Sequence, residues 1–167
     1  MKSTKKIIRV FIDTNILISG IIFKGNEHKI LNLCIKKKIN LLLSEYVIIE
    51  ANRVFSKKFP EYLYLLKNAL DILSYELIKI PKMEEIRKYT YLTRDITDLP
   101  IAISAMNAKP DYFISGDKDF FTNKIKQKLK VVTSKKFLDI YLEKSNKRLE
   151  KEWRSAGVDD LAILEIS

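Results

Sequence analysis

Five short apolar runs, separated by segments of helical length, constrain the fold of this chain most strongly. The first run, residues 7–12 (IIRVFI), is rich in β-branched residues and almost wholly apolar, which is typical of a strand buried on both faces of a parallel sheet. The other predicted strands are residues 39–43, 77–80, 112–115 and 130–132. Strands that alternate with helices predict an α/β domain around a mostly parallel sheet of about five strands.

The segments between these runs predict the helices. Ser44 is a good N-cap for a helix over residues 45–57, because its hydroxyl can accept a bond from a free backbone N–H. Pro100 suits the first turn of a helix over residues 101–107. The other predicted helices span residues 16–23, 27–38, 60–74, 83–91, 120–128 and 134–145.

The charge changes near the C-terminus, which predicts a division of the chain. Residues 150–167 contain five acids and two bases, a net charge of −3. Since the whole chain carries +10, residues 1–149 carry +13. We expect one domain over residues 1–147 and an acidic tail over residues 148–167.

The net charge favours a polyanionic partner, with nucleic acid as the first candidate. Lysine-rich surfaces also occur in proteins from warm environments, so the charge alone does not decide the partner. No apolar run is long enough to span a membrane, and residues 1–6 lead into a strand rather than the apolar core of a signal peptide. We therefore expect a soluble cytoplasmic protein without a membrane partner.

Histidine and cysteine are too rare for a zinc site built from them. His28 is the single histidine and Cys34 the single cysteine, which also excludes an intramolecular disulfide. A metal in this protein would be held by carboxylates, and this ligand type favours a hard cation such as Mg²⁺ or Mn²⁺.

Four carboxylates lie on segments that the predicted fold can bring to one edge of the sheet. Asp13 follows the first strand directly, and Asp117 follows the fourth after a Ser-Gly step. Asp98 precedes the helix before the fourth strand, and Glu50 lies on the helix after the second. Functional groups gather at the carboxyl ends of parallel strands, and a divalent cation would relieve the repulsion between such close carboxylates.

Each acid also has an ordinary structural role open to it. Asp13 can cap the helix that follows the first strand, and Asp98 can cap the helix over residues 101–107, a role that does not exclude metal binding. Glu50 can pair with Arg53, three residues later on the same helix. Asp117 and Asp119 can accept backbone hydrogen bonds in a turn. The pattern of all the acids together favours metal binding.

Four segments resemble the motifs of the PIN-domain nucleases, in the same order and with similar spacing across residues 7–140. They are VFIDTNILISGIIFKG (10–25), LLSEYVIIEANRVF (42–55), RDITDLPIAISAM (94–106) and DYFISGDKDF (111–120). The nearest resemblance is to prokaryotic PIN proteins of the toxin–antitoxin kind.

This resemblance implies a three-layer α/β/α fold and a Mg²⁺- or Mn²⁺-dependent endoribonuclease, the toxin of a toxin–antitoxin pair. It also implies single-stranded RNA as the substrate, an antitoxin protein as a partner, and a homo-oligomer such as a dimer. The implied catalytic and metal-binding acids are Asp13, Glu50, Asp98 and Asp117, with Asp119 as an auxiliary ligand or an outer acid. The implied supporting residues are Asn15, Ser115 and Asp95.

Two rival functions remain open from the sequence. A phosphatase of the haloacid-dehalogenase type also has an aspartate after its first strand, but it places a second one two residues later, where this chain has Asn15. The other rival is a PIN-like RNA-binding module with a metal site too weak for catalysis. Tight RNA binding without metal-dependent turnover would favour that module.

Overall fold

The strands form one fully parallel sheet with the order β3-β2-β1-β4-β5 in the computed structural model, which describes residues 5–157 apart from the side chain of Trp153. The strands are β1 (Arg9–Ile12), β2 (Asn40–Ser44), β3 (Tyr75–Ile78), β4 (Tyr112–Ile114) and β5 (Val131–Val132). The predicted α/β class with a five-stranded sheet is confirmed. Because β1 pairs with both β2 and β4, the carboxyl ends of these three strands lie side by side.

The pairing of β1 with β4 determines which residues meet at that edge. Ile12 is in register with Ile114, and the N–H of Asp13 donates to the Ile114 carbonyl at 3.3 Å. The rings of Phe11 and Phe113 meet edge to face, with their centres 5.4 Å apart. Both phenylalanines are fully buried. The buried centre of the sheet therefore presents Asp13 and the residue after Ile114 next to one another.

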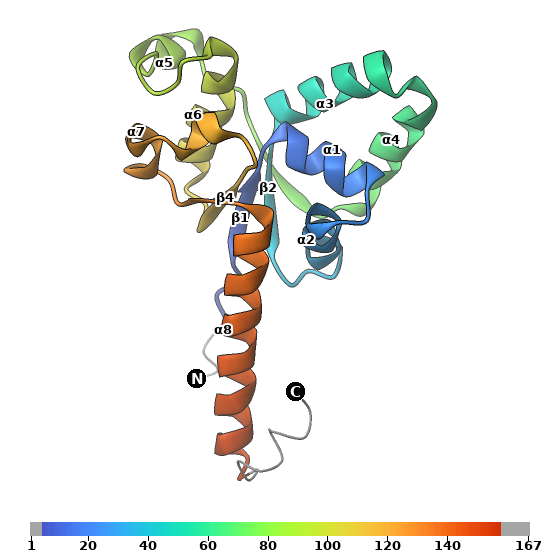
Figure 1. Cartoon of the computed structure of the whole chain (residues 1–167), viewed down its shortest axis with the longest axis vertical. Coiled ribbons are helices and arrows are strands. Elements are labelled where there is room, and N and C mark those ends of the chain that lie inside the picture. Colours follow the sequence, from blue (N-terminus) through green and yellow to red (C-terminus); the bar gives the residue numbers. More distant parts are fainter. Residues whose placement is uncertain (1–4, 158–167) are drawn as a thin grey trace. The chain divides into compact units, whose positions relative to one another are not determined.

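Helices cover both faces of the sheet, as the predicted three-layer α/β/α arrangement requires (Figure 1). In that view α1 to α4 lie on one side of the sheet and α5 to α7 on the other. Their bounds are α1 (Thr14–Ile22), α2 (Asn26–Ile35), α3 (Glu45–Lys58), α4 (Leu63–Ile72), α5 (Met83–Lys88), α6 (Leu99–Ala108) and α7 (Asn123–Lys126). Three 3₁₀ turns interrupt the connections: η1 (Pro60–Tyr62), η2 (Ile96–Asp98) and η3 (Lys118–Phe121).

Several of these bounds differ from the sequence prediction for physical reasons. The predicted helix over residues 60–74 is divided, because Pro60 begins the 3₁₀ turn η1 before α4 starts. The predicted helix over residues 120–128 becomes η3 and the short α7, whose first turn is capped by the hydroxyl of Thr122. The edge strand β3 begins at Tyr75, two residues before the predicted start, because it pairs along β2 from Leu41 onward.

The chain divides into two units, residues 1–134 and residues 135–167. The second unit contains nearly all of α8 (Ser134–Ser155), a helix that was predicted to end at residue 145. The predicted division after residue 147 falls within this helix and stays a prediction. Residues 158–167 of the predicted acidic tail lie outside the described residues.

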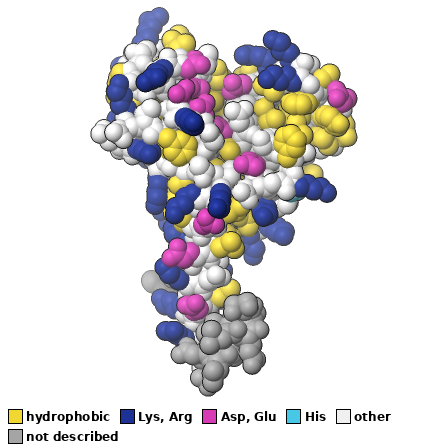
Figure 2. All heavy atoms as spheres, in the orientation of Figure 1, with side chains coloured by type: hydrophobic (Ala, Val, Ile, Leu, Met, Phe, Trp, Pro, Cys, Tyr) yellow, Lys and Arg dark blue, Asp and Glu magenta, His cyan; other side chains and the backbone are white. Residues whose placement is uncertain are grey.

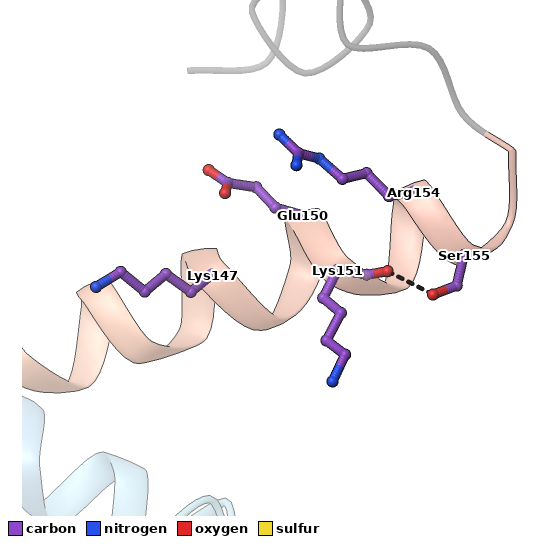
Figure 3. Close-up of a pocket in the computed structure, with 5 residues that line it drawn as sticks. All are labelled: Lys147, Glu150, Lys151, Arg154 and Ser155. Carbon is purple, nitrogen blue, oxygen red and sulfur yellow. Dashed lines mark hydrogen bonds between the residues drawn. The ribbon is translucent and has the colours of Figure 1, made fainter.

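Side-chain pairs four residues apart support the longer α8. Glu143 pairs with Lys147 at 2.6 Å, and Arg148 pairs with Glu152 at 3.4 Å. A hollow of about 420 Å³ near the end of α8 is lined by Lys147, Glu150, Lys151, Arg154 and Ser155 (Figure 3). It contains none of the predicted site residues. Neither α8 nor any other helix within residues 5–157 is long and apolar enough to cross a membrane.

Candidate metal centre

Asp13 lies at the carboxyl end of β1, with only 3% of its surface exposed. It is the N-cap of α1, since its Oδ1 accepts a bond from the N–H of Ile16 at 2.9 Å. Its Oδ2 accepts a bond from the hydroxyl of Ser115. Burial raises the pKa of Asp13 to about 6, the hydrogen bonds from Ser115 and Ile16 oppose this rise, and the charges of Asp117 and Glu50 add to it. The capping role is therefore real, and it places a buried carboxylate beside other acids.

The loop after β4 is held by a chain of hydrogen bonds that begins at Ser115. The N–H of Asp117 donates to the Ser115 hydroxyl oxygen at 3.0 Å, while that hydroxyl donates to Asp13. The N–H of Asp119 donates to Oδ1 of Asp117 at 2.9 Å, so that Asp117 caps η3. These hydrogen bonds fix the Asp117 carboxylate and the backbone of Asp119 in the loop after β4.

Asp98 is the last residue of η2 and is half-buried at the start of α6. Asp98 occupies the N-cap position of α6, but its side chain makes no capping hydrogen bond, so the capping by its carboxylate that the sequence suggested is not observed. Burial raises its pKa to about 6, together with the charges of Asp117, Asp95, Asp119 and Glu50. Asp98 faces the site, because one of its carboxylate oxygens lies within 4.8 Å of oxygens of Asp117 and Asp119.

Three carboxylates come together at this edge of the sheet. Asp98, Asp117 and Asp119 are half-buried, and each offers an oxygen that lies within 4.8 Å of the oxygens offered by the other two. We call these three residues the acidic group. Asp13 lies outside it but is joined to Asp117 through Ser115. Figure 2 shows Asp and Glu side chains gathered in the upper part of this face, among Lys and Arg side chains.

Glu50 also lies outside the acidic group, and Thr14 holds it. The hydroxyl of Thr14, the first residue of α1, donates to Oε2 of Glu50 on α3. Among the residues that the structure describes, Glu50 forms no ion pair, so the predicted pairing with Arg53 is not observed. The sequence reasoning missed Thr14, although its place directly after Asp13 at the start of a helix was a usable signal.

The supporting candidates have different positions. Asp95 caps η2, accepting bonds from the N–H of Thr97 at 2.9 Å and from its hydroxyl at 2.7 Å; these bonds lower the pKa of Asp95. Asn15 is exposed on α1.

Tyr46 was missed by the sequence reasoning. Burial raises the pKa of Tyr46, and the charge of Glu50 adds to the rise; the spacing of Tyr46 four residues before Glu50 was the available signal.

The donors at this site suit a divalent cation of the Mg²⁺ or Mn²⁺ type. All donors in the acidic group are carboxylate oxygens, which these hard cations prefer. Burial and the neighbouring negative charges raise the pKa of both Asp13 and Asp98, so holding all the acids ionised costs free energy. A bound divalent cation would remove most of that cost.

The raised pKa values predict how stability depends on pH when the protein is free of metal. The folded-state pKa of Asp13, about 6, lies above its ordinary value of 3.8, so between these values the folded state binds more protons than the unfolded chain. The stabilisation from this carboxyl is complete below pH 3.8 and is lost as the pH rises through about 6, a change of about 3 kcal/mol. Asp98 acts in the same direction with a smaller effect, because solvent screens it.

The melting temperature in EDTA should therefore fall between about pH 5 and about pH 7.5, and Mg²⁺ should reverse the fall by binding the ionised carboxylates. Thermal unfolding followed by circular dichroism measures this effect. The matched control is Asp13→Asn, which should show a smaller dependence on pH. A melting temperature that rises steadily with pH in EDTA would contradict the electrostatic description of the site.

Two solved structures have a similar fold. One is the crystal structure of VapBC2 from Rickettsia felis bound to a DNA fragment from their promoter, with a TM-score of 0.58 and 20% identity over 75% of this chain and 98% of that chain. The other is PAE2754 from Pyrobaculum aerophilum, with a TM-score of 0.56 and 14% identity over 78% of this chain and 93% of that chain. No match was found among curated proteins. These likenesses agree on the fold.

The family model for the PIN domain matches residues 9–119. The matched region contains Asp13, Glu50 and the whole acidic group, as well as the four motifs that indicated this family from the sequence. The match favours the PIN interpretation over the haloacid-dehalogenase alternative. Because the match covers more than half of the chain, the protein belongs to the PIN-domain family, a family of nucleases.

Proposed function

We propose that this protein is a metal-dependent endoribonuclease that hydrolyses phosphodiester bonds in single-stranded RNA. The observation that carries the proposal is the acidic group: three carboxylates within 4.8 Å of one another, beside the buried Asp13, in a chain of a nuclease family. No Lys or Arg side chain balances the negative charge of these acids, because none of the ion pairs among the described residues involves them.

In this proposal Asp98, Asp117 and Asp119 hold Mg²⁺ or Mn²⁺, with Asp13 and Glu50 as further ligands. The cation supplies electrostatic stabilisation of the scissile phosphate and makes water a stronger nucleophile. The protein's part is to hold the carboxylates in place. Ser115 does this for Asp13 and Asp117 together, because its hydroxyl donates to Asp13 and accepts from the Asp117 N–H.

RNA as the substrate is supported by the net charge of +10 and by the Lys and Arg side chains around the acids in Figure 2. Basic side chains neutralise backbone phosphates and would bring a nucleic acid toward the acidic group.

A toxin role with an antitoxin partner is supported by the resemblance of the four motifs to PIN proteins of that kind. The fold likeness to VapBC2, which was solved with DNA from their promoter, agrees with it. We extend the proposal to a homo-oligomer in the cytoplasm, with the PIN domain over residues 1–147 and an acidic tail after it.

The test of the proposed function is cleavage of single-stranded RNA by the purified protein in Mg²⁺ or Mn²⁺, with and without EDTA. We expect internal cleavage that requires the cation and is abolished by EDTA, because no cation is then bound at the acidic group to offset the phosphate charge. Duplex RNA and single-stranded DNA serve as comparison substrates. Cleavage that survives both EDTA and the Asp13→Asn substitution would reject the mechanism, and tight RNA binding without turnover would favour the binding-module alternative.

A further inference from the structure

Thr14 makes a hydrogen bond that none of its usual roles at the start of a helix explains. The capping of α1 is already supplied by Asp13, whose carboxylate accepts the N–H of Ile16. The Thr14 hydroxyl instead donates to Glu50, 36 residues away on α3. Thr14 is 5% exposed, so this hydroxyl has little access to water as an alternative partner.

Glu50 depends on this bond for its orientation. It is half-buried on α3, and Thr14 is its hydrogen-bond partner among the described residues. Oε2 is engaged by the Thr14 hydroxyl, while Oε1 forms no hydrogen bond within the described part of the chain. The charge of Glu50 contributes to the raised pKa of both Asp13 and Asp98, so the carboxylate lies close enough to the site to act on it.

Asp13 receives a hydrogen bond of the same kind. Ser115 donates its hydroxyl to Asp13, as Thr14 does to Glu50. These two acids are the ones outside the acidic group, and each is oriented by a buried hydroxyl. A hydroxyl that donates to one oxygen of a carboxylate fixes the direction of the other, which is how outer residues orient metal ligands.

We propose that Thr14 is a positioning residue that orients Glu50 for binding of the divalent cation. This inference rests on the proposed metal-dependent function and deepens it. Thr14 acts through Glu50 and needs no contact with the cation or with RNA. The side chain of threonine suits the task, because its branched Cβ restricts the direction of the hydroxyl in the first turn of α1.

The experiment measures Mn²⁺ affinity by isothermal titration calorimetry in a double-mutant cycle of Thr14→Val and Glu50→Gln. Valine keeps the branched shape and removes the hydroxyl. We expect Thr14→Val to weaken Mn²⁺ binding about tenfold, and Thr14→Ser to restore it to within about twofold of the original. In the Glu50→Gln background, Thr14→Val should cause no further loss, because the carboxylate that it orients is absent.

A matched control removes another threonine hydroxyl at the start of a helix. Thr122 caps α7 by accepting the N–H of Ile125 and contacts none of the acids through its hydroxyl. Thr122→Val should lower the melting temperature slightly and leave Mn²⁺ affinity unchanged. Thermal unfolding of every variant shows whether it is folded, and Thr14→Ala, which also removes the hydroxyl, takes the place of Thr14→Val if that variant is not.

Three results would overturn the inference: wild-type affinity in Thr14→Val, an equal loss in the wild-type and Glu50→Gln backgrounds, or no Mn²⁺ binding by the wild-type protein. A loss that Thr14→Ser fails to restore would also overturn it. If the wild-type protein binds Mn²⁺ but cleaves no RNA, the proposed ribonuclease function fails while the cycle still decides the role of Thr14.

Discussion

Replacing Asp117 with asparagine should lower the rate of RNA cleavage more than about a hundredfold while leaving the protein folded. Residues that only support a metal ligand typically change activity by about 10- to 100-fold, so loss of a carboxylate from the acidic group should exceed that range. Asp117 is central to the group because its carboxylate lies with those of Asp98 and Asp119, and its backbone is bound through Ser115 to Asp13.

Asparagine is the sharpest substitution because it preserves the local structure. The amide oxygen of asparagine can accept the Asp119 N–H as the carboxylate does now, so η3 keeps its cap. The substitution removes a negative charge that raises the pKa of Asp13 and of Asp98. Without metal, Asp117→Asn should therefore be as stable as the wild-type protein or slightly more stable.

The matched control is Asp71→Asn, an exposed aspartate on α4. It loses the same charge outside the site and should retain full cleavage. A time course with a labelled single-stranded RNA, together with thermal unfolding in EDTA, measures both effects. Cleavage by Asp117→Asn within about threefold of the wild-type rate would show that the acidic group is not the catalytic centre.

The sequence was informative about the fold because the strands are short, apolar and β-branched. Residues 7–12 were predicted as a buried strand and residues 112–115 as the fourth strand, and β1 and β4 occupy most of these segments. The bounds of the helices were harder to predict, because the deciding interactions are local and polar. The cap by Thr122 shortens α7, and ion pairs four residues apart extend α8.

The sequence predicted which acids form the site better than it predicted where their carboxylates lie relative to one another. Asp13 and Asp117 were placed at one sheet edge because both follow strands, and the neighbouring positions of β1 and β4 confirm that their segments meet. Asp119 was predicted to be an auxiliary ligand or an outer acid, which stays a prediction, and its carboxylate lies with those of Asp98 and Asp117. Asp119 lies in the 3₁₀ turn η3, which the sequence analysis did not predict; it predicted a helix over residues 120–128 instead.

Thr14 and Tyr46 show what a sequence pattern omits. Neither residue has an obvious role at a metal site, since a hydroxyl is a weaker ligand for these cations than a carboxylate. Their importance comes from the fold: Thr14 on α1 donates to Glu50 on α3, and the charge of Glu50 contributes to the raised pKa of Tyr46. Such contacts join residues far apart in the chain, and the spacing of motifs does not contain the packing that creates them.

The central claim is that the acidic group binds a divalent cation. In the structure the carboxylates of Asp98, Asp117 and Asp119 lie together, while two further acids, Asp13 and Glu50, accept hydrogen bonds from hydroxyls. Three ionised carboxylates this close together repel one another, and burial adds to the cost for Asp98. A cation with oxygen ligands is the physical solution, and Mn²⁺ can be located directly by its anomalous scattering.

The most direct measurement is anomalous difference density from crystals soaked in Mn²⁺. We predict a peak about 2.0–2.6 Å from oxygens of Asp98, Asp117 and Asp119 in the wild-type protein, and its loss in crystals of Asp117→Asn. The absence of a peak at these three carboxylates at saturating Mn²⁺, with the residues in the positions described, would contradict the account.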